Sequence, residues 1–445
     1  MSTTHNVSKA LPLVAYGSVA APMAILIVPL YNYLPTFYAS DLAVNLSAIG
    51  VIFFVSRLWD SLLDPLIGML SDHTRSRWGR RKPWIVAASP GLVVLSYAIC
   101  VPPASAGNTY VTLVLFLFYV AWSCVRIPHL AWGAELAHDY VERSRVVMFR
   151  EVLFMLGILS AVVLPAFLFG REALNLRRVM YLYAMMIVVL IPATTLFAMT
   201  LTPDSAVGGI TKTSLSDVIQ ILRSRSAFVR LIVAYSLMQL GSTIWDSLVI
   251  FLMTRVLHLD HEFLWIISIQ VLVTIAAMPA VFRAGRTIDK HRLLALFAIG
   301  FPLGGLILAT APAGNIGIAV LGVAILAISV APWRVMPTSM AADCADLDRL
   351  QSGVDRTGTH MAVITFFFKL ALAAGVGIAF PLLDAIGFDS RGANSPAVLS
   401  HLRMIVSILP GLVMLPALFM LWNYPLTRSV HSNIRRQLDA GPRSA

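Results

Sequence analysis

Charged side chains are scarce in this chain of 445 residues, and their scarcity argues against a soluble protein. Only 12% of the residues are charged and 58% are hydrophobic, whereas a soluble domain would carry about 25% charge. The mean hydropathy is +0.81, and apolar runs of ~20 residues, each able to cross a ~30 Å hydrocarbon core as a helix, recur along the chain. These runs lack the alternation of polar and apolar residues that marks the strands of a membrane barrel. The composition predicts an all-α protein that crosses a membrane many times.

Cysteine is also rare, and the motifs of several enzyme classes are missing. The three cysteines, Cys100, Cys124 and Cys344, are far apart and show neither metal-ligand spacing nor a disulfide framework, so we expect buried thiols. Neither a glycine-rich nucleotide loop nor a nucleophile elbow is present. We therefore expect that the protein is neither an enzyme nor an ATP-driven pump and that it uses no cofactor. The short polar stretch before Leu11 lacks a signal-peptide pattern, which makes Leu11 onward the first predicted span.

The net charge of +11 is concentrated in connections on one side of the predicted membrane. These connections and the tail contain Arg75, Arg77, Arg80, Arg81 and Lys82; Arg143 and Arg145; Lys212, Arg223 and Arg225; Arg286, Lys290 and Arg292; Arg349 and Arg356; Arg428, Arg435 and Arg436. The opposite side has Arg171, Arg177, Arg178 and Arg391. This asymmetry is the positive-inside bias and predicts a multi-pass cell-membrane protein with both termini in the cytoplasm. It argues against a nucleic-acid partner.

The apolar pattern predicts twelve membrane-spanning helices. Their ranges are 13–36, 44–71, 83–102, 109–135, 147–170, 177–200, 227–256, 263–284, 292–311, 315–342, 358–386 and 399–424. A long polar connection at 201–226 separates a first bundle of six helices, within 1–200, from a second one, within 227–427, and a cytoplasmic tail follows at 428–445. Two six-helix bundles are the layout of a major facilitator transporter, which holds its substrate near the midplane.

Two carboxylates inside the second predicted span are the most informative feature of the chain. Asp60 and Asp64 are four residues apart, so they share one face of a helix. An aspartate at the centre of a bilayer helix costs ~2.5–3.5 kcal/mol, and acids inside membranes usually mark an ion or proton path. The alternative is an internal salt bridge to a basic residue elsewhere.

A longer motif surrounds this pair of acids. It reads Arg57-Leu-Trp-Asp60-Ser-Leu-Leu-Asp64-Pro, followed by Ser71-Asp72-His-Thr-Arg75-Ser-Arg77-Trp-Gly-Arg80-Arg81-Lys82-Pro-Trp84. This run resembles the glycoside–pentoside–hexuronide:cation symporters of the major facilitator superfamily, the family typified by the melibiose permease. Weaker agreement follows at Ile127-Pro128 through Glu135-Leu136, at Ala342-Asp343-Cys344-Ala345-Asp346 and at Lys369. The resemblance covers most of the chain.

The resemblance assigns roles to several residues. It implies that Asp60 and Asp64 bind the coupling cation, which is Na⁺ if the carrier is sodium-coupled and a proton otherwise. It adds the hydroxyl of Ser123 to the cation site, for which the alternative is a helix-packing serine. It places Lys369 near the same site, where we expect it to face Asp60 or Asp64 and compensate their charge. Snorkelling to the membrane interface is the alternative for Lys369.

Two positions depart from the family pattern and bear on the solute. Melibiose-type members grip sugar hydroxyls with one aspartate on helix 4 and one on helix 1; these places are Arg126 and, more loosely aligned, Ala24 here. Arginine presents a fixed fork of donors that suits a carboxylate, phosphate or sulfonate, so a small anionic, uronide-like solute is expected. The alternative is that Arg126 pairs with an internal acid such as Asp60, Asp64 or Glu135.

Further polar and aromatic residues are candidates for the solute cavity. Gln239, Ser242 and Asp246 share one face of the seventh span. The remaining candidates are His129, Trp132, Trp245 and Arg334. Each has a structural alternative, which is packing for the aromatic residues and interfacial anchoring for Arg334.

The basic loop after the second span is interpreted as a gate and topology element, not as a phosphate site. We expect Asp72 to contact the arginines Arg75, Arg77, Arg80 or Arg81, or a helix N-terminus. Asp343, Asp346 and Arg356 form the expected counterpart in the second half.

Together these features predict a cation-coupled symporter that works by alternating access, with a small solute, a monovalent cation and the lipid bilayer as its partners. We expect a monomer. A neutral sugar remains open as the solute, as does a lysolipid-like amphiphile, because the vertebrate lysolipid–sodium symporter shares the family and the apolar face around Ala20, Ala21 and Ala24 would suit such a molecule. A non-transporting membrane sensor fits the paired acids less well.

Overall fold

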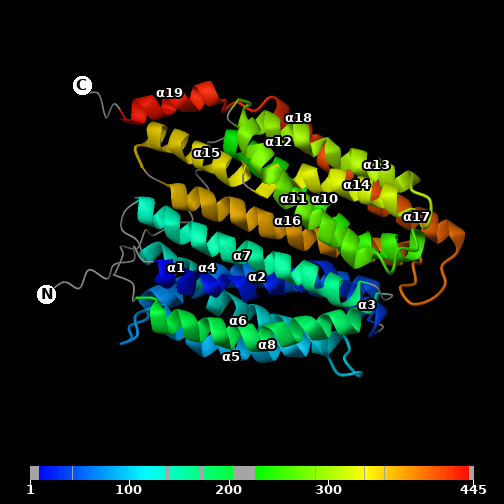
Figure 1. Ribbon diagram of the computed structural model, residues 1–445. Coiled ribbons are helices and arrows are strands. Elements are labelled where there is room, and N and C mark those ends of the chain that lie inside the picture. Colours follow the sequence, from blue (N-terminus) through cyan, green and yellow to red (C-terminus); the bar gives the residue numbers. More distant parts are fainter. Residues whose placement is uncertain are drawn as a thin grey trace. The chain divides into compact units, whose positions relative to one another are not determined.

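The computed structural model describes residues 10–42, 44–136, 140–170, 174–203, 226–285, 287–334, 336–354 and 356–439. Within these ranges the chain forms helices and no strands (Figure 1). Twelve of the described helical segments are long and apolar enough to cross a membrane. They cover 10–40, 46–73, 82–100, 108–133, 145–169, 176–201, 226–256, 263–281, 290–310, 316–352, 357–385 and 396–422. The predicted all-α fold class and the number of spans are confirmed.

Some residues used to predict the orientation lie outside the described ranges. They are Arg171, Lys212, Arg223, Arg225 and Arg286, and the side chain of Arg143 is not described either. The predicted inter-bundle connection falls mostly within 204–225, which is also outside these ranges.

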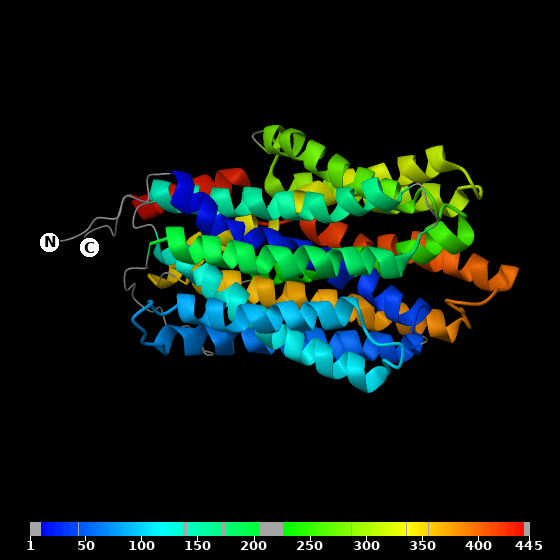
Figure 2. The ribbon, with the colours of Figure 1, turned by 60° about the horizontal axis from the view of Figure 1, so that its bottom comes forward.

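The chain divides into two compact units, Met1–Ile210 and Thr211–Ala445. The helices of unit 1 are α1 (Ala10–Ser18), α2 (Ala20–Val28), α3 (Leu34–Ser40), α4 (Leu46–His73), α5 (Lys82–Cys100), α6 (Asn108–Glu135), α7 (Tyr140–Phe169) and α8 (Leu176–Leu201). They run side by side (Figure 2). The first span, α1 to α3, packs on α7 and α8, while α6 packs on α4 and α5, and α5 packs on α8.

Unit 2 repeats this pairing of helices. Its helices are α10 (Ser226–Phe251), α11 (Phe263–Ala284), α12 (Lys290–Ala298), α13 (Gly300–Thr310), α14 (Ile316–Val330), α15 (Met336–Ser352), α16 (Thr357–Ala385), α17 (Pro396–Ser407), α18 (Leu409–Trp422) and α19 (Arg428–Asp439). The seventh span, α10, packs on α16 and α18, and α14 packs on α11 and α13. Each unit therefore has the same order of helix contacts, as expected for an internal repeat.

The first span contains a break that later positions a functional side chain. A π-helical turn occupies Pro29–Tyr33, and Leu34 donates its backbone N–H to the Pro29 carbonyl. The next such donor would be residue 35, a proline, which has no N–H. The carbonyl of Leu30 therefore loses its partner within the helix and needs another donor.

The tenth span is longer than predicted. We predicted that it ends at residue 342, but the helical segment continues to Ser352 after a 3₁₀ turn at Ala331–Arg334. The extra turns are polar because they contain Asp343, Asp346 and Asp348. Basic side chains of unit 2 pair with all three carboxylates, which lets the helix continue past its apolar part.

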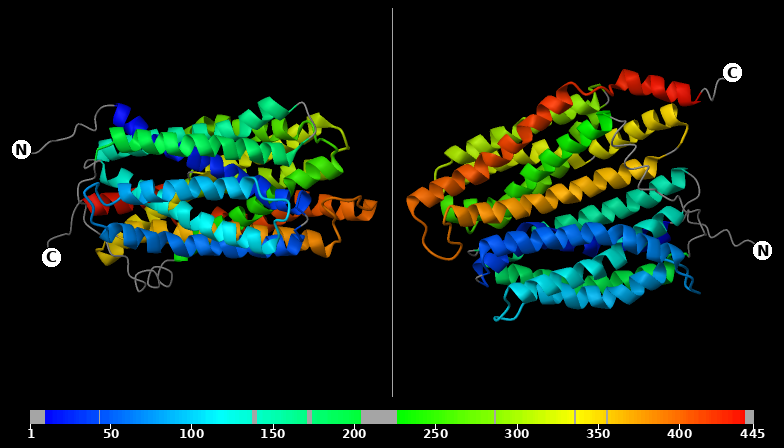
Figure 3. Two further views of the ribbon diagram at one scale, coloured as in Figure 1. Left: turned by 90° about the horizontal axis from the view of Figure 1, so that it is seen from below. Right: turned by 180° about the vertical axis from the view of Figure 1, so that it is seen from behind.

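The predicted cytoplasmic tail contains a helix that packs on unit 2. Helix α19 contacts α15, and Figure 3 shows it, in red, alongside the yellow helix. Its first residue, Arg428, donates its backbone N–H to Asp289 at 2.9 Å and a guanidinium N–H to the Gly285 carbonyl at 2.6 Å. The beginning of this helix is thus attached to the connection between α11 and α12.

Candidate functional site

The two carboxylates of α4 meet the hydroxyl of Ser123 from α6. The side chain of Asn45 caps α4 by accepting from the Ala48 N–H at 3.1 Å, and the helix presents Asp60 and Asp64 on one face. Ser123 Oγ lies 3.0 Å from Asp64 Oδ1 and 3.3 Å from Asp60 Oδ1. A hydroxyl has one proton to donate, so this serine serves one carboxylate at a time. Ser123 and Asp60 are buried.

Arg126 lies beside the same cluster, one helical turn after Ser123. Its Nη1 atom is 3.6 Å from Asp64 Oδ2, and the exposed fractions of the two side chains are 34% and 19%. At this distance the contact is an ion pair and not a good hydrogen bond, and its partial exposure makes it weak. The alternative interpretation of Arg126, pairing with an internal acid, is therefore realised on Asp64. About a third of the Arg126 side chain stays exposed, and its contact with a solute stays a prediction.

A second arginine, which the sequence analysis mentioned only as part of the motif, is buried close to the carboxylates. Arg57 precedes Asp60 by three residues on α4, and its guanidinium carbon lies 4.3 Å from the centroid of the Tyr31 ring. Its Nη2 donates to the Leu30 carbonyl at 3.2 Å, the group that Pro35 leaves without a helical partner. Arg57 thus ties the break in the first span to the acidic helix. Its signal in the sequence was a basic residue one turn before Asp60 inside an apolar segment.

The chemistry of this cluster fits a small hard cation. Asp60, Asp64 and Ser123 bring two carboxylates and one hydroxyl oxygen together, and hard cations prefer oxygen ligands. No group of three or more histidine, cysteine, aspartate or glutamate side chains suited to a metal ion occurs among the described residues. A transition-metal site is therefore not indicated in the described part of the chain.

His129 and Trp132 are placed in the packing of unit 1. The His129 ring stacks on Tyr16 with centroids 4.5 Å apart, and its Nε2 lies 2.9 Å from the Tyr16 carbonyl oxygen. Trp132 meets the edge of the same tyrosine and donates Nε1–H to the Pro203 carbonyl at 3.3 Å. Both are buried. These contacts favour the structural alternative for the two residues, because both rings pack against Tyr16 inside unit 1.

The apolar face of the first span is also occupied by packing. Ala24 is fully buried, and a side chain added at Gly157 of α7 would meet it at 2.9 Å and the Ala21 carbonyl oxygen at 2.4 Å. The alternative of an amphiphilic solute relied on this face, which is the seam between α2 and α7 in the structure.

The candidates on α10 form a short polar stripe in unit 2. Ser242 Oγ lies 3.4 Å from Asp246 Oδ2, and Gln239 donates to Thr243 Oγ1 at 3.1 Å. Trp245 is buried, and its Nε1 has no hydrogen-bond partner in the described part of the chain. Gln239, Ser242 and Asp246 therefore share a face as predicted, whereas the ring of Trp245 is part of the core.

Lys369 and Arg334 belong to unit 2 as well. Lys369 is half-buried on α16 beside Phe368, whose ring stacks on Tyr235 at 5.4 Å. Arg334 is exposed at the end of the 3₁₀ turn that interrupts the tenth span. The expected approach of Lys369 to Asp60 or Asp64 joins the two units and stays a prediction.

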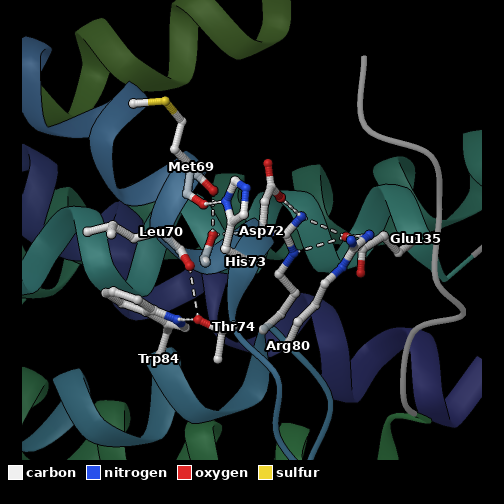
Figure 4. Close-up of polar contacts among 11 residues, drawn as sticks. Met69, Leu70, Asp72, His73, Thr74, Arg80, Trp84 and Glu135 are labelled. Carbon is white, nitrogen blue, oxygen red and sulfur yellow. Dashed lines mark hydrogen bonds and ion pairs between the residues drawn. The ribbon is translucent and has the colours of Figure 1, made fainter. Parts of the chain in front are cut away.

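The basic loop after α4 forms a buried ion-pair cluster with α4 and α6 (Figure 4). Arg81 pairs with Asp72, and Arg80 and Arg81 both reach Glu135 Oε1, at 2.7 and 2.8 Å. Arg81 also donates to Ser71 Oγ at 2.7 Å. The expected contact between Asp72 and a loop arginine is present, while Arg75 and Arg77 are exposed. The cluster holds the ends of α4 and α6 and the beginning of α5 together, and its role as a gate stays a prediction.

Unit 2 has a comparable cluster at α15. Asp343 pairs with Lys290 at 2.7 Å, and Asp346 accepts from His431 of α19 at 2.9 Å. Arg356 lies 3.8 Å from Asp348. Asp343 and Asp346 thus contact α12 and α19, and Arg356 pairs with a third acid of the same helix.

The fold and the placement of the polar residues define a membrane transporter of the major facilitator superfamily. Residues 15–428 match the profile of the family described as MFS/sugar transport protein. Because the match spans most of the chain, the protein belongs to this family, and it is a multi-pass membrane protein.

Curated relatives agree with this assignment. The chain is 26% identical to the uncharacterized symporter sll1374 of Synechocystis, over 96% of each chain. It is 22% identical to the glucuronide carrier protein homolog of Escherichia coli, covering 92% of this chain and 90% of the relative. It is 23% identical to the human sodium-dependent lysophosphatidylcholine symporter 1, with 91% and 81% covered.

Solved structures agree in fold. The crystal structure of a mutant form of the nucleoside transporter NupG superposes with a TM-score of 0.68 at 12% identity, covering 93% of this chain and 100% of that one. At this identity the likeness establishes the fold alone.

Proposed function

We propose that this protein is a cation-coupled symporter of a small glycoside-type solute with an anionic group. The observation that carries the proposal is the position of Asp64, which is shared by the Ser123 hydroxyl at 3.0 Å and the Arg126 guanidinium at 3.6 Å. The family and the relatives named as symporters support cation coupling. The glucuronide carrier homolog supports a uronide-like solute.

In the proposed mechanism, Arg126 and the coupling cation compete for Asp64. Without the cation, the guanidinium compensates the charge of this carboxylate. A Na⁺ ion or a proton that enters among Asp60, Asp64 and Ser123 takes over this role, and its positive charge weakens the ion pair. A long and partly exposed pair of this kind is worth only about 0–1 kcal/mol, so the exchange meets little resistance.

The released guanidinium then becomes a receptor for the solute. Its fork of N–H donors matches a carboxylate in a bidentate way, and such a partner replaces the charge that Asp64 supplied. The cation and the anionic solute thereby favour one another, which is the thermodynamic requirement for coupled transport. The half-buried Lys369 is proposed to compensate the bare acids when the empty carrier reorients.

Uptake into proteoliposomes tests this function. A glucuronide, a neutral galactoside and a lysophospholipid are offered in parallel, first under a Na⁺ gradient and then under a pH gradient. We expect concentrative uptake of the glucuronide, driven by one of the two gradients. Asp64→Asn should abolish concentrative uptake while sparing solute binding; unchanged gradient-driven uptake in this variant would refute cation coupling at Asp64.

Arginine variants test the anionic solute. Charged hydrogen bonds contribute about 1.5–3 kcal/mol, so we expect Arg126→Gln to raise the KM for the glucuronide roughly 10- to 150-fold. The control, Arg292→Gln, removes the same charge from an exposed position and should leave this KM unchanged. Equal KM values for the glucuronide in wild type and Arg126→Gln would contradict the proposed solute contact.

A neutral sugar is the second candidate, and the Arg126–Asp64 ion pair favours it because the guanidinium already has an internal partner. Preference for the galactoside would select it. The lysophosphatidylcholine symporter among the relatives supports a lysolipid, although Ala20 and Ala24 are buried.

A further inference from the structure

A groove on unit 1 lies apart from the carboxylate cluster and has no role in the proposed mechanism. It runs between α5 and α8, has a volume of about 760 Å³, and begins at the basic loop. Arg77, Trp78 and Lys82 form its mouth. No acidic residue is among the twelve described residues that line it.

The walls of the groove are apolar and open outward. Val94 of α5 and Leu196 of α8 line it with exposed fractions of 65% and 67%. Exposed apolar side chains on membrane-spanning helices face lipid tails and not water. Val94 is twelve residues after Lys82, which is ~18 Å along a helix, and one leaflet has ~15 Å of hydrocarbon. The groove therefore extends along the depth of one leaflet.

The floor of the groove holds the two helices at a fixed separation. Ser89 and Thr195 are buried and their hydroxyl oxygens lie 3.2 Å apart, which bridges α5 and α8. Pro90 and Pro192 also line the groove, and each lacks the N–H that would close a helical hydrogen bond.

The ninth and twelfth spans of unit 2 correspond to the third and sixth spans of unit 1, and they approach each other through glycines. A side chain added at Gly305 of α13 would meet the Ser407 carbonyl oxygen at 2.0 Å, and one at Gly411 of α18 would meet Pro302 at 2.8 Å. The glycines thus bring the ninth and twelfth spans into backbone contact. The third and sixth spans instead meet through the side chains of Ser89 and Thr195.

The basic residues at the mouth are not those of the ion-pair cluster, although both sets belong to the same loop. Arg80 and Arg81 turn toward Glu135 and Asp72, whereas Arg77 is exposed. Lys82 donates to the Thr202 carbonyl oxygen at 3.0 Å, which places its ammonium at the end of α8. Trp78 is 53% exposed at this mouth, as is common for tryptophan at the boundary between headgroups and tails.

We propose that this groove is a binding site for an anionic phospholipid, with the phosphate at Arg77 and Lys82 and an acyl chain along the walls. Basic pockets between membrane helices hold anionic headgroups in this manner. The apolar length argues for a whole lipid, because a free phosphate would use only the mouth.

Lipid binding to the purified full-length protein tests the site. Dioleoyl phosphatidylglycerol and dioleoyl phosphatidylcholine are titrated separately, and native mass spectrometry measures the affinity for each. We expect tighter binding of the phosphatidylglycerol. One basic residue near an anionic surface contributes about 1 kcal/mol, so Arg77→Gln should weaken phosphatidylglycerol binding about fivefold. Leu196→Trp, which narrows the apolar wall, should weaken the binding of phosphatidylglycerol without a change of charge.

Arg75→Gln is the matched control, since Arg75 is an exposed arginine of the same loop that does not line the groove. It should leave phosphatidylglycerol binding unchanged. Equal affinity for the two lipids, or an equal loss in Arg75→Gln and Arg77→Gln, would overturn the proposal. Displacement of the phosphatidylglycerol by glycerol 3-phosphate would assign the mouth to a free phosphate and would also overturn it.

Discussion

At the scale of single residues, the hydroxyl of Ser123 offers a direct test of the cation site. It lies within 3.3 Å of both carboxylates, so Ser123→Ala removes one oxygen ligand from the proposed cation site. We expect the cation concentration for half-maximal uptake to rise on the order of tenfold, which corresponds to about 1.4 kcal/mol. Ser123→Thr, which keeps the hydroxyl, should retain most of the affinity.

The control for this experiment is Ser96→Ala. Ser96 is a buried serine of α5 whose hydroxyl donates to the Leu92 carbonyl. An equal change in cation dependence in both alanine variants would mean that the effect reflects helix stability and not cation binding.

Single-residue predictions succeeded where helix spacing alone determines the geometry. The i, i+4 spacing predicted that Asp60 and Asp64 share one face, and the family resemblance predicted that Ser123 lies close to them, as it does. Spacing did not reveal the surroundings of His129 and Trp132, because the angle around a helix does not say which neighbour lies there. Gly133 leaves room for the Tyr16 hydroxyl, which lies 1.9 Å from the position of an added Cβ. That long-range contact is not visible in the sequence of α6.

At the scale of helices, the seam between α2 and α7 depends on a missing side chain. A Cβ added at Gly157 would lie 2.4 Å from the Ala21 carbonyl oxygen, so Gly157→Ala must separate the two helices. Overpacking typically costs 1–3 kcal/mol, and we expect a lower midpoint of thermal unfolding, measured by fluorescence in detergent. Gly91→Ala is the matched control because nothing lies within 4 Å of its added Cβ; alanine should stabilise that helix. An equal decrease in both variants would contradict close packing at Gly157.

Apolar length predicted the limits of most spans to within a few residues, but it predicted neither their interruptions nor the extension of the tenth span. The π-helical turn at Pro29–Tyr33 depends on a distant donor, Arg57, which takes the role of a missing N–H only once α4 is packed beside it. The extension of the tenth span to Ser352 depends on ion pairs with α12 and α19. Both features arise from tertiary partners, and hydropathy along the chain carries no information about them.

At the scale of the whole molecule, the charge asymmetry predicts an orientation that labelling can test. In a variant without native cysteines, we introduce Ser76→Cys in the basic loop or Ala393→Cys in the connection before α17. Both positions are outside the spans. A membrane-impermeant maleimide added to intact cells should label the second variant and spare the first, because arginine-rich loops stay in the cytoplasm. Labelling of the first variant alone would show that the orientation is the opposite of the predicted one. Permeabilised cells, in which both positions should be labelled, are the control for reactivity.

The coupling between cation and solute is also a property of the whole molecule. If Arg126 leaves Asp64 when the cation binds, the cation should raise the affinity for the glucuronide about two- to fivefold, the equivalent of the weak ion pair that is broken. The glucuronide should raise the cation affinity by the same factor. Isothermal titration of the purified protein measures both affinities. Asp64→Asn should reduce this factor to near one.

Arg126→Gln separates exchange from a purely structural ion pair. Loss of the Arg126 guanidinium removes the competitor for Asp64. The cation should therefore bind about two- to fivefold more tightly in the absence of solute, which is the strength of a weak ion pair. The same substitution should abolish the mutual enhancement by the glucuronide, because no guanidinium is released to receive it. A structural pair would leave that enhancement intact, and finding it intact would assign the coupling to other groups. The direction of both changes follows from one contact, the 3.6 Å approach of Arg126 to Asp64.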